Sequence, residues 1–459
     1  MYQIDFHKPI RIYFIGIGGI SMSGLAEILL AEDFVVSGSD RAPSDLTHML
    51  EERGVKVFYG QREENISGDI DLVVYTAAIK SDNPELIAAK RRNIPTLTRA
   101  ELLGQMMKNY KTPIAVSGTH GKTTTTSMIS QILLNAEADP TLSIGGIYRP
   151  IGGNIRVGTS ELFVTEACEY TNSFLSFFPK IGIILNIEED HLDFFKDLSD
   201  IRNSFHRFAE LLPEDGTLII NGGIDRCEEL TAGLPCRVIT YGLDSGLDYT
   251  ATRITYDESG FPSFYVHKKG SDDRNFSLRV HGEHNILNAL AAIALADLLN
   301  LSDEVIRAGL LAFVGTDRRF EYKGQVNGVN IIDDYAHHPT EIRATLNAAL
   351  QYPHRRLWCV FQPHTYTRTK AFLAEFAAAL SLADEIVLAD IYAAREKDTL
   401  GISSETLQEK IRSLGHPCQY FPTFEAIENY LLKNCTKDDL LITMGAGDVV
   451  KIGENLLKK

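Results

Sequence analysis

The chain has 459 residues, of which 44% are hydrophobic and 23% charged, and its formal charge is −16. This length predicts roughly two to four domains, and the composition is that of a globular protein. The acidic balance argues against a nucleic-acid partner, since binding a polyanion requires Lys and Arg to displace counterions, but it leaves small anionic substrates open. No apolar run approaches the ~20 residues of a membrane span, so we expect no membrane insertion.

The six cysteines are scattered and form no CxxC pair, which favours reduced thiols over a zinc or redox motif. The first residues, MYQIDFHKPIRIYFIGIGG, include Asp5 and lead into a strand, whereas a secretory signal would have a longer apolar core before a cleavage site. We therefore expect a cytoplasmic protein.

The first segment, residues 1–108, alternates strands and helices. RIYFIGIGG (11–19) reads as a strand that enters a glycine turn, SMSGLAEILLAED (21–33) as a helix, FVVSGSD (34–40) as a second strand and DLVVYTAAI (71–79) as a later one. This alternation predicts a Rossmann-like parallel sheet covered by helices.

The second segment, residues 109–316, continues the alternation. Its predicted strands are TPIAVSG, ELFVTEA and IGIILNI, and its predicted helices are THGKTTTTSMISQILLNA and HGEHNILNALAAIALADLL. Residues 240–280 instead alternate apolar and polar side chains between turn signals, which is typical of antiparallel hairpins. We predict a P-loop ATPase-like domain with a mostly parallel sheet and an antiparallel edge.

The third segment, residues 317–459, repeats a pattern of strand, turn and helix. The repeats are GVNIIDDYAHHPTEIRATLNAAL, RRLWCVFQPHTYTRTKAFLAEFAAAL, DEIVLADIYAAREK and DLLITMGAGDVVKIGENLL. This pattern predicts a C-terminal Rossmann-like α/β domain. The expected fold class is therefore α/β with three domains.

The stretch SGTHGKT (117–123) lies between a predicted strand and a predicted helix. It matches the end of the phosphate-binding pattern GxxxxGK[ST], although a valine stands where the leading glycine belongs. Gly118 and Gly121 allow backbone N–H groups to approach an anion, and the following helix directs its positive end at that anion. Lys122 can bridge the β- and γ-phosphates of ATP, and Thr123 can ligate Mg²⁺. The alternative is a structural glycine turn with a surface lysine.

The stretch GIGGIS also follows a strand and opens a helix. It approximates the dinucleotide-binding pattern GxGxxG, with Gly16, Gly18 and Gly19 in the turn and Ser21 in place of the third glycine. Asp40 ends the next predicted strand, 24 residues after Gly16, about where an acidic residue would hold a ribose hydroxyl. We predict a diphosphate site here, and the alternative is a structural turn.

A dehydrogenase would need only the GIGGIS turn, and a simple ATPase would need only the SGTHGKT turn. Together the two turns indicate an enzyme that joins a nucleotide-linked substrate to ATP chemistry.

Polar side chains gather where further strands end, which is where ligands collect in parallel α/β sheets. Glu166 closes a predicted strand and offers the oxygen ligands that Mg²⁺ prefers. His191 follows another strand, in a position to ligate a second metal or to touch the transferred phosphate. DDYAHHP (333–339) and QPHTYTRTK (362–370) place cationic side chains at strand ends, which suits a carboxylate substrate. The alternatives are a structural histidine and solvated polar turns.

Eight stretches occur in order between residues 16 and 448: GIGGISMSG, SGTHGKTTTTS, EACEYTNSF, NIEEDHLD, GEHNILNA, DDYAHHP, FQPHTYTRT and MGAGD. As an ordered set they resemble the Mur ligase family over essentially the whole chain. The resemblance implies an ATP-dependent amide ligase of peptidoglycan precursor synthesis. It would join L-alanine to UDP-N-acetylmuramate through an acyl phosphate.

The resemblance also implies which residues bind the substrates. The N-terminal domain would hold the UDP part of UDP-N-acetylmuramate, at Gly16, Gly18, Gly19, Ser21 and Asp40. The ATP-binding residues would be Gly118, Thr119, His120, Gly121, Lys122, Thr123, Thr124, His284, Asn285, Asn288, Arg319 and Asp334. The carboxylate of L-alanine would be held by His337 and Arg368.

For the chemical step, the resemblance implies that Lys122, Glu166 and His191 are catalytic. Lys122 would share the charge of the transferred phosphate with Mg²⁺. Thr123 and Glu166 would ligate one magnesium ion and His191 a second. ATP and Mg²⁺ are thus the expected cofactors, and either a monomer or a homodimer is compatible with this chemistry.

Three positions depart from the family pattern. Thr365 stands where some members carry an Arg that serves the amino-acid carboxylate. Cys168 stands where others have Asp, in the loop beside Glu166. Ser21 replaces the third glycine of the first turn.

Three other functions stay open. A peptide-recycling ligase, which adds a ready-made tripeptide to UDP-N-acetylmuramate, has a similar sequence. An oxidoreductase with a nicotinamide dinucleotide would use GIGGIS but would leave SGTHGKT without a role. A silent nucleotide-binding regulator is disfavoured by the intact Lys122, Glu166 and His191.

Overall fold

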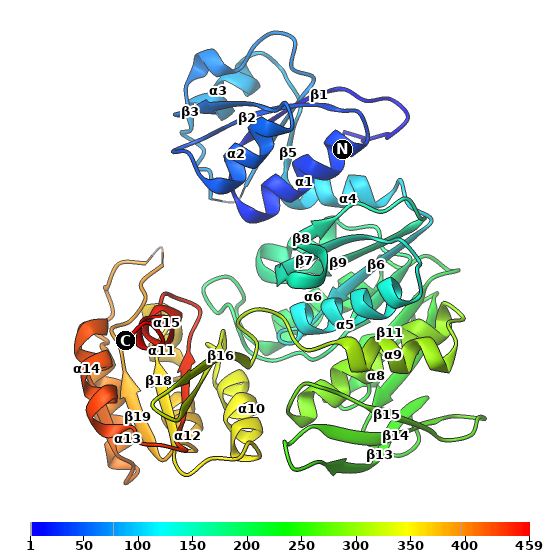
Figure 1. Cartoon of the computed structure of the whole chain (residues 1–459). Coiled ribbons are helices and arrows are strands. Elements are labelled where there is room, and N and C mark those ends of the chain that lie inside the picture. The colour runs from blue at the N-terminus through cyan, green and yellow to red at the C-terminus, as the bar shows by residue number, and fades with distance from the viewer. Residues whose placement is uncertain (1, 77, 395) are drawn as a thin grey trace. The chain divides into compact units, whose positions relative to one another are not determined.

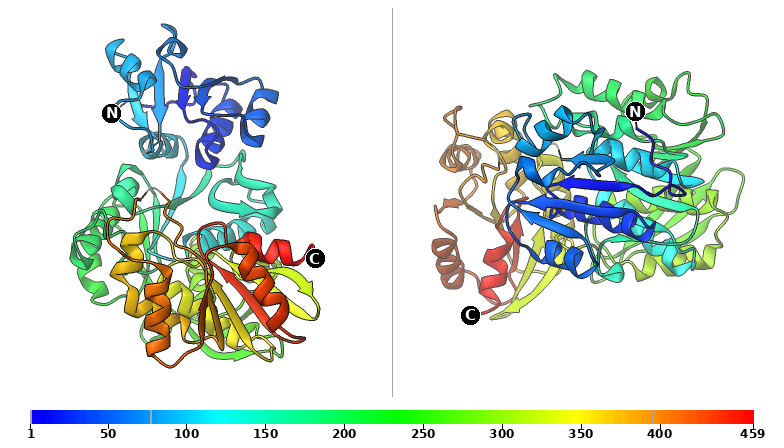
Figure 2. Two further views of the ribbon diagram at one scale, coloured as in Figure 1. Left: turned by 90° about the vertical axis from the view of Figure 1, so that its left-hand side faces the viewer. Right: turned by 90° about the horizontal axis from the view of Figure 1, so that it is seen from above.

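The structure is a computed structural model that describes residues 2–76, 78–394 and 396–459 (Figures 1 and 2). Its described strands form three sheets. The chain forms two compact units, unit 1 and unit 2: Met1–Ile187 with Ile201–Thr240, and Glu188–Asp200 with Tyr241–Lys459. Ala77 of the predicted strand 71–79 and Arg395 of the predicted repeat 384–397 lie outside the described residues.

The first sheet is parallel throughout and has the strand order β3-β2-β1-β4-β5. Its strands are β1 (Arg11–Ile15), β2 (Val35–Asp40), β3 (Lys56–Tyr59), β4 (Leu72–Tyr75) and β5 (Thr96–Thr98). The helical elements of this part are α1 (Ile20–Ala31), α2 (Asp45–Glu52), η1 (Glu63–Asn65), α3 (Pro84–Arg91) and α4 (Arg99–Met107). The strand order reverses between β1 and β4, and ligands of such sheets bind beyond the carboxyl ends of the strands at that point.

The second sheet has the order β15-β14-β13-β12-β11-β10-β6-β9-β7-β8. Its first seven strands along the chain are β6 (Thr112–Ser117), β7 (Thr141–Tyr148), β8 (Gly153–Arg156), β9 (Leu162–Ala167), β10 (Ile181–Ile184), β11 (Thr217–Asn221) and β12 (Arg237–Gly242). The helical elements among them are α5 (Lys122–Asn135), η2 (Arg149–Ile151), η3 (Tyr170–Ser176), α6 (Leu198–Ala209) and α7 (Cys227–Thr231). The central pairs β9–β6, β6–β10 and β10–β11 are parallel.

The predicted antiparallel edge is formed by β13 (Tyr249–Tyr256), β14 (Pro262–Lys268) and β15 (Arg274–Ser277). The helices α8 (Glu283–Leu298) and α9 (Asp303–Ala312) follow, and α8 packs against β13 and β14. Asp297 of α8 joins the two layers, because its carboxylate accepts hydrogen bonds from Tyr249 (2.9 Å), Lys268 (2.9 Å) and Arg274 (2.8 Å).

The third sheet has the order β16-β17-β21-β18-β19-β20. Its strands are β16 (Glu321–Val326), β17 (Val329–Asp334), β18 (Leu357–Phe361), β19 (Glu385–Leu388), β20 (Cys418–Tyr420) and β21 (Leu440–Met444). The helices are α10 (Pro339–Leu350), α11 (Tyr366–Ala371), α12 (Leu373–Leu380), α13 (Ser404–Ser413), α14 (Phe424–Asn434) and α15 (Val450–Leu456). All described pairs are parallel except β16–β17.

Both faces of the third sheet are buried, as expected for a sheet covered by helices on each side (Figure 1). Neighbouring residues of one strand alternate between two cores: Ile332 packs with α10, α12 and α13, whereas Ile331 packs with α14 and α15. This period of two is the geometry of a strand, so a near-continuous apolar run serves both layers.

The predicted α/β fold class is confirmed, and there are three local differences from the predictions. The helix after β6 begins at Lys122 rather than Thr119, because Gly121 is left-handed at its N-cap. Strand β10 ends at Ile184, before the segment that holds the phosphate loop. The repeat at 384–397 has no helix over its described residues, and the next helix begins at Ser404.

No helix among the described residues is long and apolar enough to cross a membrane. All six cysteines are free thiols.

Candidate active site

The predicted phosphate loop of unit 1 connects β6 to α5. Gly118 (φ +145°) and Gly121 (φ +82°) adopt backbone conformations that L side chains rarely adopt, so both positions need glycine. Asn186 fastens the loop, because its side chain accepts from the N–H of His120 (2.8 Å) and donates to the His120 carbonyl (3.1 Å). Its own carbonyl accepts from the N–H of the buried Thr119 (3.2 Å). The N-terminus of α5 is thereby fixed in place at the loop, with its positive end toward an incoming anion.

Lys122, the first residue of α5, is held inside this loop. Its Nζ donates to the carbonyl oxygens of Gly118 (2.5 Å) and Thr119 (3.0 Å) and to the Glu169 carboxylate (3.0 Å). The side chains of Lys122 and Glu169 are 17% and 2% exposed. Burial alone would lower the pKa of Lys122, but the Glu169 carboxylate outweighs burial and holds that pKa above its ordinary value. The predicted phosphate-binding lysine is therefore charged and already paired with a buried carboxylate.

Thr123 and Glu166 meet at the carboxyl edge of the same sheet. Glu166 lies opposite Val116 in the parallel β6–β9 pair, and its Oε2 accepts from Thr123 Oγ1 (3.1 Å). The N–H of Gly145 donates to the other carboxylate oxygen (2.5 Å), and a Cβ at Gly145 would overlap that carboxylate. A hydroxyl and a carboxylate are hard oxygen donors, so this pair fits a magnesium ion. Thr124, the next residue, is partly exposed.

The first glycine turn, between β1 and α1, contains a fixed carboxylate. The N–H of Gly18 donates to Asp40 Oδ2 (2.8 Å), and the N–H of Arg41 donates to Oδ1 (2.7 Å). Gly16 is left-handed (φ +84°), and Gly19 is the N-cap of α1, whose first turn has no acidic residue. The structure thus brings the predicted residues of this turn together with Asp40, whose carboxylate fixes the turn.

Sequence reasoning missed Arg99 at this turn. Arg99 is the first residue of α4, and its Nη1 donates to the hydroxyl of Ser21 in the first turn of α1 (3.0 Å). The two residues are 78 positions apart in the chain, and only the parallel sheet brings them together.

In unit 2, the predicted adenine-binding residues lie in the first turns of α8. Asn285 and Asn288 are each 6% exposed. Asn288 donates to the side-chain oxygen of Asn285 (3.0 Å), and Asn285 donates to the carbonyl of His281 (2.7 Å). His284 is exposed on the same turn. Desolvation by neighbouring atoms nevertheless lowers the pKa of His284 to about 4, and the Arg319 guanidinium acts in the same direction. The imidazole of His284 is therefore neutral at pH 7.

Asp334 and Arg319 lie near His284 in unit 2. Asp334 ends β17 and accepts from the N–H groups of Phe320 (2.8 Å) and Ala336 (2.7 Å). Burial raises the pKa of Asp334 to about 6, although the Arg319 guanidinium opposes that rise. Because Arg319 acts electrostatically on both His284 and Asp334, three of the predicted nucleotide-contacting groups share one neighbourhood.

The backbone on both sides of Arg319 is strained, since Arg318 (φ +63°) and Phe320 (φ +46°) are left-handed. The guanidinium of Arg318 bonds the fully buried Asp333 (3.0 Å) and the carbonyl of Gly445 (2.7 Å). Asp333 therefore anchors the segment that contains Arg318 and does not belong to a solvated polar turn. This role could not be predicted from the sequence, because Arg318 and Asp333 meet only in the folded chain.

The predicted amino-acid-binding residues form a cluster with His364 and Asp190. Arg368 donates to Asp190 Oδ1 through Nε (3.2 Å) and Nη2 (2.7 Å), and its Nη1 lies 3.1 Å from His364 Nδ1. The side chains of Arg368 and Asp190 are 10% and 7% exposed. Burial would raise the pKa of Asp190, but Arg368 outweighs it and holds that pKa well below its usual range. The His337 and His364 rings lie 5.5 Å apart.

The two imidazoles of this cluster are neutral at pH 7. Burial lowers the pKa of His337 to about 4, with a smaller contribution in the same direction from Arg368. Burial and Arg368 likewise lower the pKa of His364 to about 4. Arg368 is thus the cation of the cluster, and its carboxylate partner is Asp190.

His191 follows Asp190 directly and belongs to the same unit. The His191 N–H donates to Asp190 Oδ1 (2.7 Å), and its Nε2 lies 3.7 Å from Oδ2. Its imidazole is 25% exposed, and its backbone is left-handed (φ +53°). The structure therefore places His191 beside the Arg368 cluster of unit 2, while Lys122, Thr123 and Glu166 come together in unit 1.

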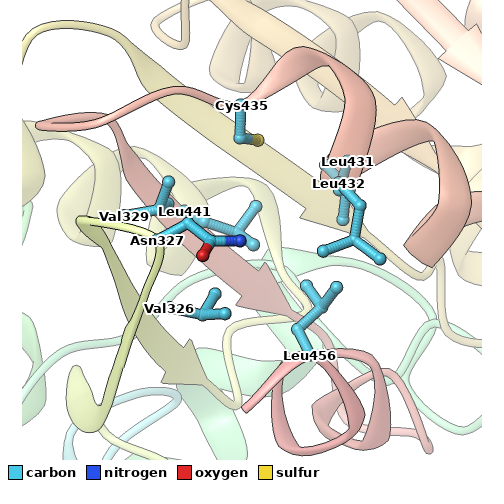
Figure 3. A pocket seen from close by; sticks show the side chains of 8 residues that line it. All are labelled: Val326, Asn327, Val329, Leu431, Leu432, Cys435, Leu441 and Leu456. Carbon is cyan, nitrogen blue, oxygen red and sulfur yellow. The ribbon is translucent and has the colours of Figure 1, made fainter. Parts of the chain in front are cut away.

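A small apolar pocket is lined by none of these residues (Figure 3). Its cavity of about 20 Å³ has room for roughly one water molecule and is lined by Val326, Asn327, Val329, Leu431, Leu432, Cys435, Leu441 and Leu456. No charged side chain lines it, so it offers nothing to a phosphate or carboxylate substrate.

Comparisons with known proteins identify the class. Three family models match the chain: the Mur ligase family catalytic domain over residues 11–111, the Mur ligase middle domain over 116–296 and the Mur ligase glutamate ligase domain over 318–447. The chain belongs to the Mur ligase family.

Particular relatives narrow this class further. The UDP-N-acetylmuramate–L-alanine ligases of Agathobacter rectalis and Lachnospira eligens are 62% and 61% identical to this chain, over 100% of both sequences in each case. Among solved structures, UDP-N-acetylmuramate-alanine ligase MurC of Thermotoga maritima matches with a TM-score of 0.81 and 30% identity, covering 98% of each chain. A murein peptide ligase of Psychrobacter arcticus matches with a TM-score of 0.72 and 26% identity, again over 98% of each chain.

Proposed function

We propose that this chain is an ATP-dependent ligase that joins L-alanine to UDP-N-acetylmuramate in peptidoglycan precursor synthesis. The observation that carries the proposal is the arrangement of Lys122, Thr123 and Glu166 at one glycine turn, in a chain 62% identical over its full length to a ligase of that name. A second glycine turn at Gly16–Gly19 supplies a separate place for the UDP-linked substrate.

The reaction needs two displacements. The carboxylate oxygen of the muramoyl group attacks the γ-phosphorus of ATP, which forms an acyl phosphate and releases ADP. The amine of L-alanine then attacks the acyl carbon, gives up a proton and displaces inorganic phosphate, which leaves an amide. No covalent bond to the protein is required, so the side chains act by positioning the reactants and by stabilising charge.

Lys122 makes the electrostatic contribution on the side of the transferred phosphate. In the structure its Nζ lies against Glu169 and two loop carbonyls, all within reach of one side chain. When ATP binds, the β- and γ-phosphates replace some of these partners, and the charge of Lys122 follows the phosphate through the transfer. Glu169 keeps the lysine charged and in place when no nucleotide is bound.

The donors Thr123 and Glu166 would hold Mg²⁺, which neutralises phosphate charge and orients the γ-phosphate in this kind of chemistry. His191 is our candidate for a second metal or a direct phosphate contact. The His191 N–H donates a hydrogen bond to Asp190, which is part of the proposed amino-acid cluster of unit 2.

In unit 2, His284, Asn285, Asn288, Arg319 and Asp334 are the proposed nucleotide contacts. Arg368 is the proposed fork for the carboxylate of L-alanine, with His337 beside it. A neutral His337 suits this role, because a second cation would repel the ammonium form of the incoming amino acid. Lys122 belongs to unit 1 and Arg368 to unit 2.

We propose three domains with the boundaries 1–108, 109–316 and 317–459. They are supported by the family models, which match 11–111, 116–296 and 318–447. We further propose a cytoplasmic enzyme, because ATP and a UDP-linked precursor are its substrates. Nothing in the reaction requires more than a monomer, although a homodimer is compatible with it.

The first experiment is to measure phosphate release from Mg²⁺-ATP with UDP-N-acetylmuramate, with and without L-alanine. Release that requires both substrates supports the proposed ligase. Release with UDP-N-acetylmuramate and the free tripeptide, and none with L-alanine, would reassign the chain to peptide recycling. No release with either acceptor would contradict the ligase activity and revive the silent regulator.

A further inference from the structure

His281, two residues before α8, lies among aromatic side chains from three separate segments of unit 2. Its imidazole is 8% exposed, and its ring centroid lies 4.4 Å from that of Phe261, 4.9 Å from that of Phe320 and 5.5 Å from that of Tyr352. Phe261 belongs to the turn between β13 and β14, Phe320 directly precedes β16, and Tyr352 follows α10. Phe320 and Tyr352 also pack against the core of the third sheet. His281 therefore connects the antiparallel edge of the second sheet with that core.

One hydrogen bond fixes the orientation of the His281 imidazole. Its Nε2 lies 3.0 Å from the carbonyl oxygen of Ser259, and because a carbonyl only accepts, Nε2 is the donor. Burial lowers the pKa of His281 below its ordinary value, so the ring is neutral at pH 7 and its proton is on Nε2. The turn that supplies this carbonyl is itself fixed, since the Asp257 carboxylate accepts from the N–H groups of Ser259 (2.9 Å) and Phe261 (2.9 Å).

The proposed adenine contacts depend on the backbone at residues 281 and 282. The carbonyl of His281 accepts from Asn285 Nδ2 (2.7 Å), and Asn285 Oδ1 accepts in turn from Asn288 (3.0 Å). Gly282 is left-handed (φ +91°), and a Cβ there would lie 2.5 Å from Cε1 of His284, so the His284 ring rests on the Gly282 backbone. The side chain that anchors this short segment is His281.

Phe320 extends the same arrangement to the other proposed nucleotide contacts. It follows Arg319 directly in the chain, and its N–H donates to the Asp334 carboxylate (2.8 Å). Its left-handed backbone (φ +46°) is a strained conformation, which persists only where neighbouring groups hold it, and the His281 ring is one of those groups. His281 thus lies between the two segments that carry the proposed nucleotide contacts of unit 2.

We propose that His281 is a positioning residue for ATP, because its imidazole holds the start of α8 and the Phe320 segment in the arrangement that binds the nucleotide. The inference deepens the proposed function and rests on it, since it requires ATP to bind at these residues. The role needs no contact between His281 and the nucleotide, because the ring acts through the backbone of residues 281–282 and through Phe320.

The test is a set of binding measurements that need no turnover. Calorimetry with a non-hydrolysable ATP analogue plus Mg²⁺, and separately with UDP-N-acetylmuramate, compares the wild type with H281A and H281F. We expect H281A to weaken binding of the ATP analogue roughly 10-fold and binding of UDP-N-acetylmuramate less than about twofold. H281F keeps the aromatic packing and loses the hydrogen bond to Ser259, so its loss for the analogue should be about threefold.

Steady-state kinetics give a second readout. H281A should raise the KM for ATP about as much as it weakens binding of the analogue, and kcat should stay within about twofold, because the reacting groups are unchanged.

F264L is the matched control. Phe264 is a fully buried aromatic residue of the same sheet edge, and its ring pairs with Phe276 (6.3 Å). F264L should lower the thermal stability, as H281A does, but should leave the affinity for the ATP analogue within about twofold. A shared loss of affinity in F264L and H281A would mean that any damage to this edge weakens ATP binding, which contradicts a specific role of His281.

Phe261 allows a test of the route through His281. F261A removes one neighbour of the imidazole and leaves His281 in place, so it should weaken binding of the ATP analogue about threefold. In F261A/H281A the two losses should not add, because Phe261 acts through His281. Fully additive losses would contradict this coupling.

Three further outcomes separate the inference from the proposed function. Unchanged affinity for the ATP analogue in H281A, or equal losses for both ligands, would overturn the inference and leave His281 a residue of the core. If H281A does not fold, H281F and F261A decide by the same comparison. No ligase activity, with intact and His281-dependent binding of the analogue, would contradict the proposed function and leave the inference standing.

Discussion

The two glycine turns of unit 1 look alike in sequence but differ in how their cations are balanced. At the second turn, Lys122 lies on a carboxylate, Glu169, that is 2% exposed. At the first turn, Arg99 has a hydroxyl partner and no carboxylate among the residues that the structure describes. The charge of Lys122 is thus balanced by a buried carboxylate, whereas that of Arg99 is held by a hydroxyl.

The physical consequence is a difference in what ligand binding changes. A phosphate that binds at Lys122 must compete with Glu169 and with two loop carbonyls, so part of its interaction energy is offset by the partners it displaces. The Arg368–Asp190 pair of unit 2 is similar to the Lys122–Glu169 pair, because Arg368 also has a buried carboxylate partner. Four predictions separate these cases.

The largest expected effect is that of K122M on catalysis. Turnover should fall about a thousandfold or more, since a preorganised charge at the transferring phosphate is lost. The measurement is ADP formation with both substrates saturating. Because K122M leaves Glu169 buried without its cation, K122M/E169Q is the control, and it should recover stability without recovering turnover. Turnover within tenfold of the wild type would contradict the phosphate role of Lys122.

The second prediction contrasts the two turns directly through stability. E169Q should lower the free energy of unfolding by about 3 kcal/mol, because it leaves a buried lysine without its counter-ion. R99M should not lower that free energy. Chemical denaturation of both variants without ligand is the measurement. Similar losses of unfolding free energy in E169Q and R99M would mean that Lys122 and Arg99 do not differ in whether a carboxylate balances their charge.

The third prediction concerns Arg368. R368A should raise the KM for L-alanine roughly 10–100-fold and change the KM for ATP much less, because the fork that binds the substrate carboxylate is lost. R368K is the matched variant and should retain only part of the affinity. Equal changes in both KM values would exclude Arg368 from the amino-acid site.

The smallest expected effect is a pH dependence from His337. Its pKa is about 4 in the folded chain, below the ~6.5 of an unfolded histidine, so unfolding takes up a proton between those two values. Stability should therefore fall as the pH falls from about 6.5 towards 4, by about 2 kcal/mol at pH 5 from this group alone. H337N should make the stability curve flatter in that window. If H337N leaves the dependence of stability on pH unchanged, His337 is solvated, and the ring beside Arg368 does not stay neutral throughout this pH range.

Much of the fold and of the candidate site could be predicted from residues that are neighbours in sequence. The strand before SGTHGKT, the glycines with positive φ and the lysine that opens α5 are all local features. The alternation of strands and helices predicted parallel sheets, and the period-two pattern of 240–280 predicted the antiparallel edge. Pairing Glu166 with Thr123 was implied by the family resemblance, and in the structure the two side chains are in contact.

The residues that sequence reasoning missed are the charge partners. Glu169 and Asp190 stand inside the stretches EACEYTNSF and NIEEDHLD, yet nothing local shows that they face Lys122 and Arg368. The Arg318–Asp333 clamp was missed for the same reason, since adjacent carboxylates in DDYAHHP look equivalent until Asp333 is seen to be buried.

The sequence by itself determined the class of the protein and both glycine turns, because a backbone conformation and a helix start depend on a few adjacent residues. Only the tertiary structure decided the electrostatic state of the site. Lys122 and Glu169 are 47 residues apart, Arg99 and Ser21 are 78 apart, and Asp190 and Arg368 are 178 apart. A charge interaction depends on distance and burial in three dimensions, and neither is a property of sequence spacing.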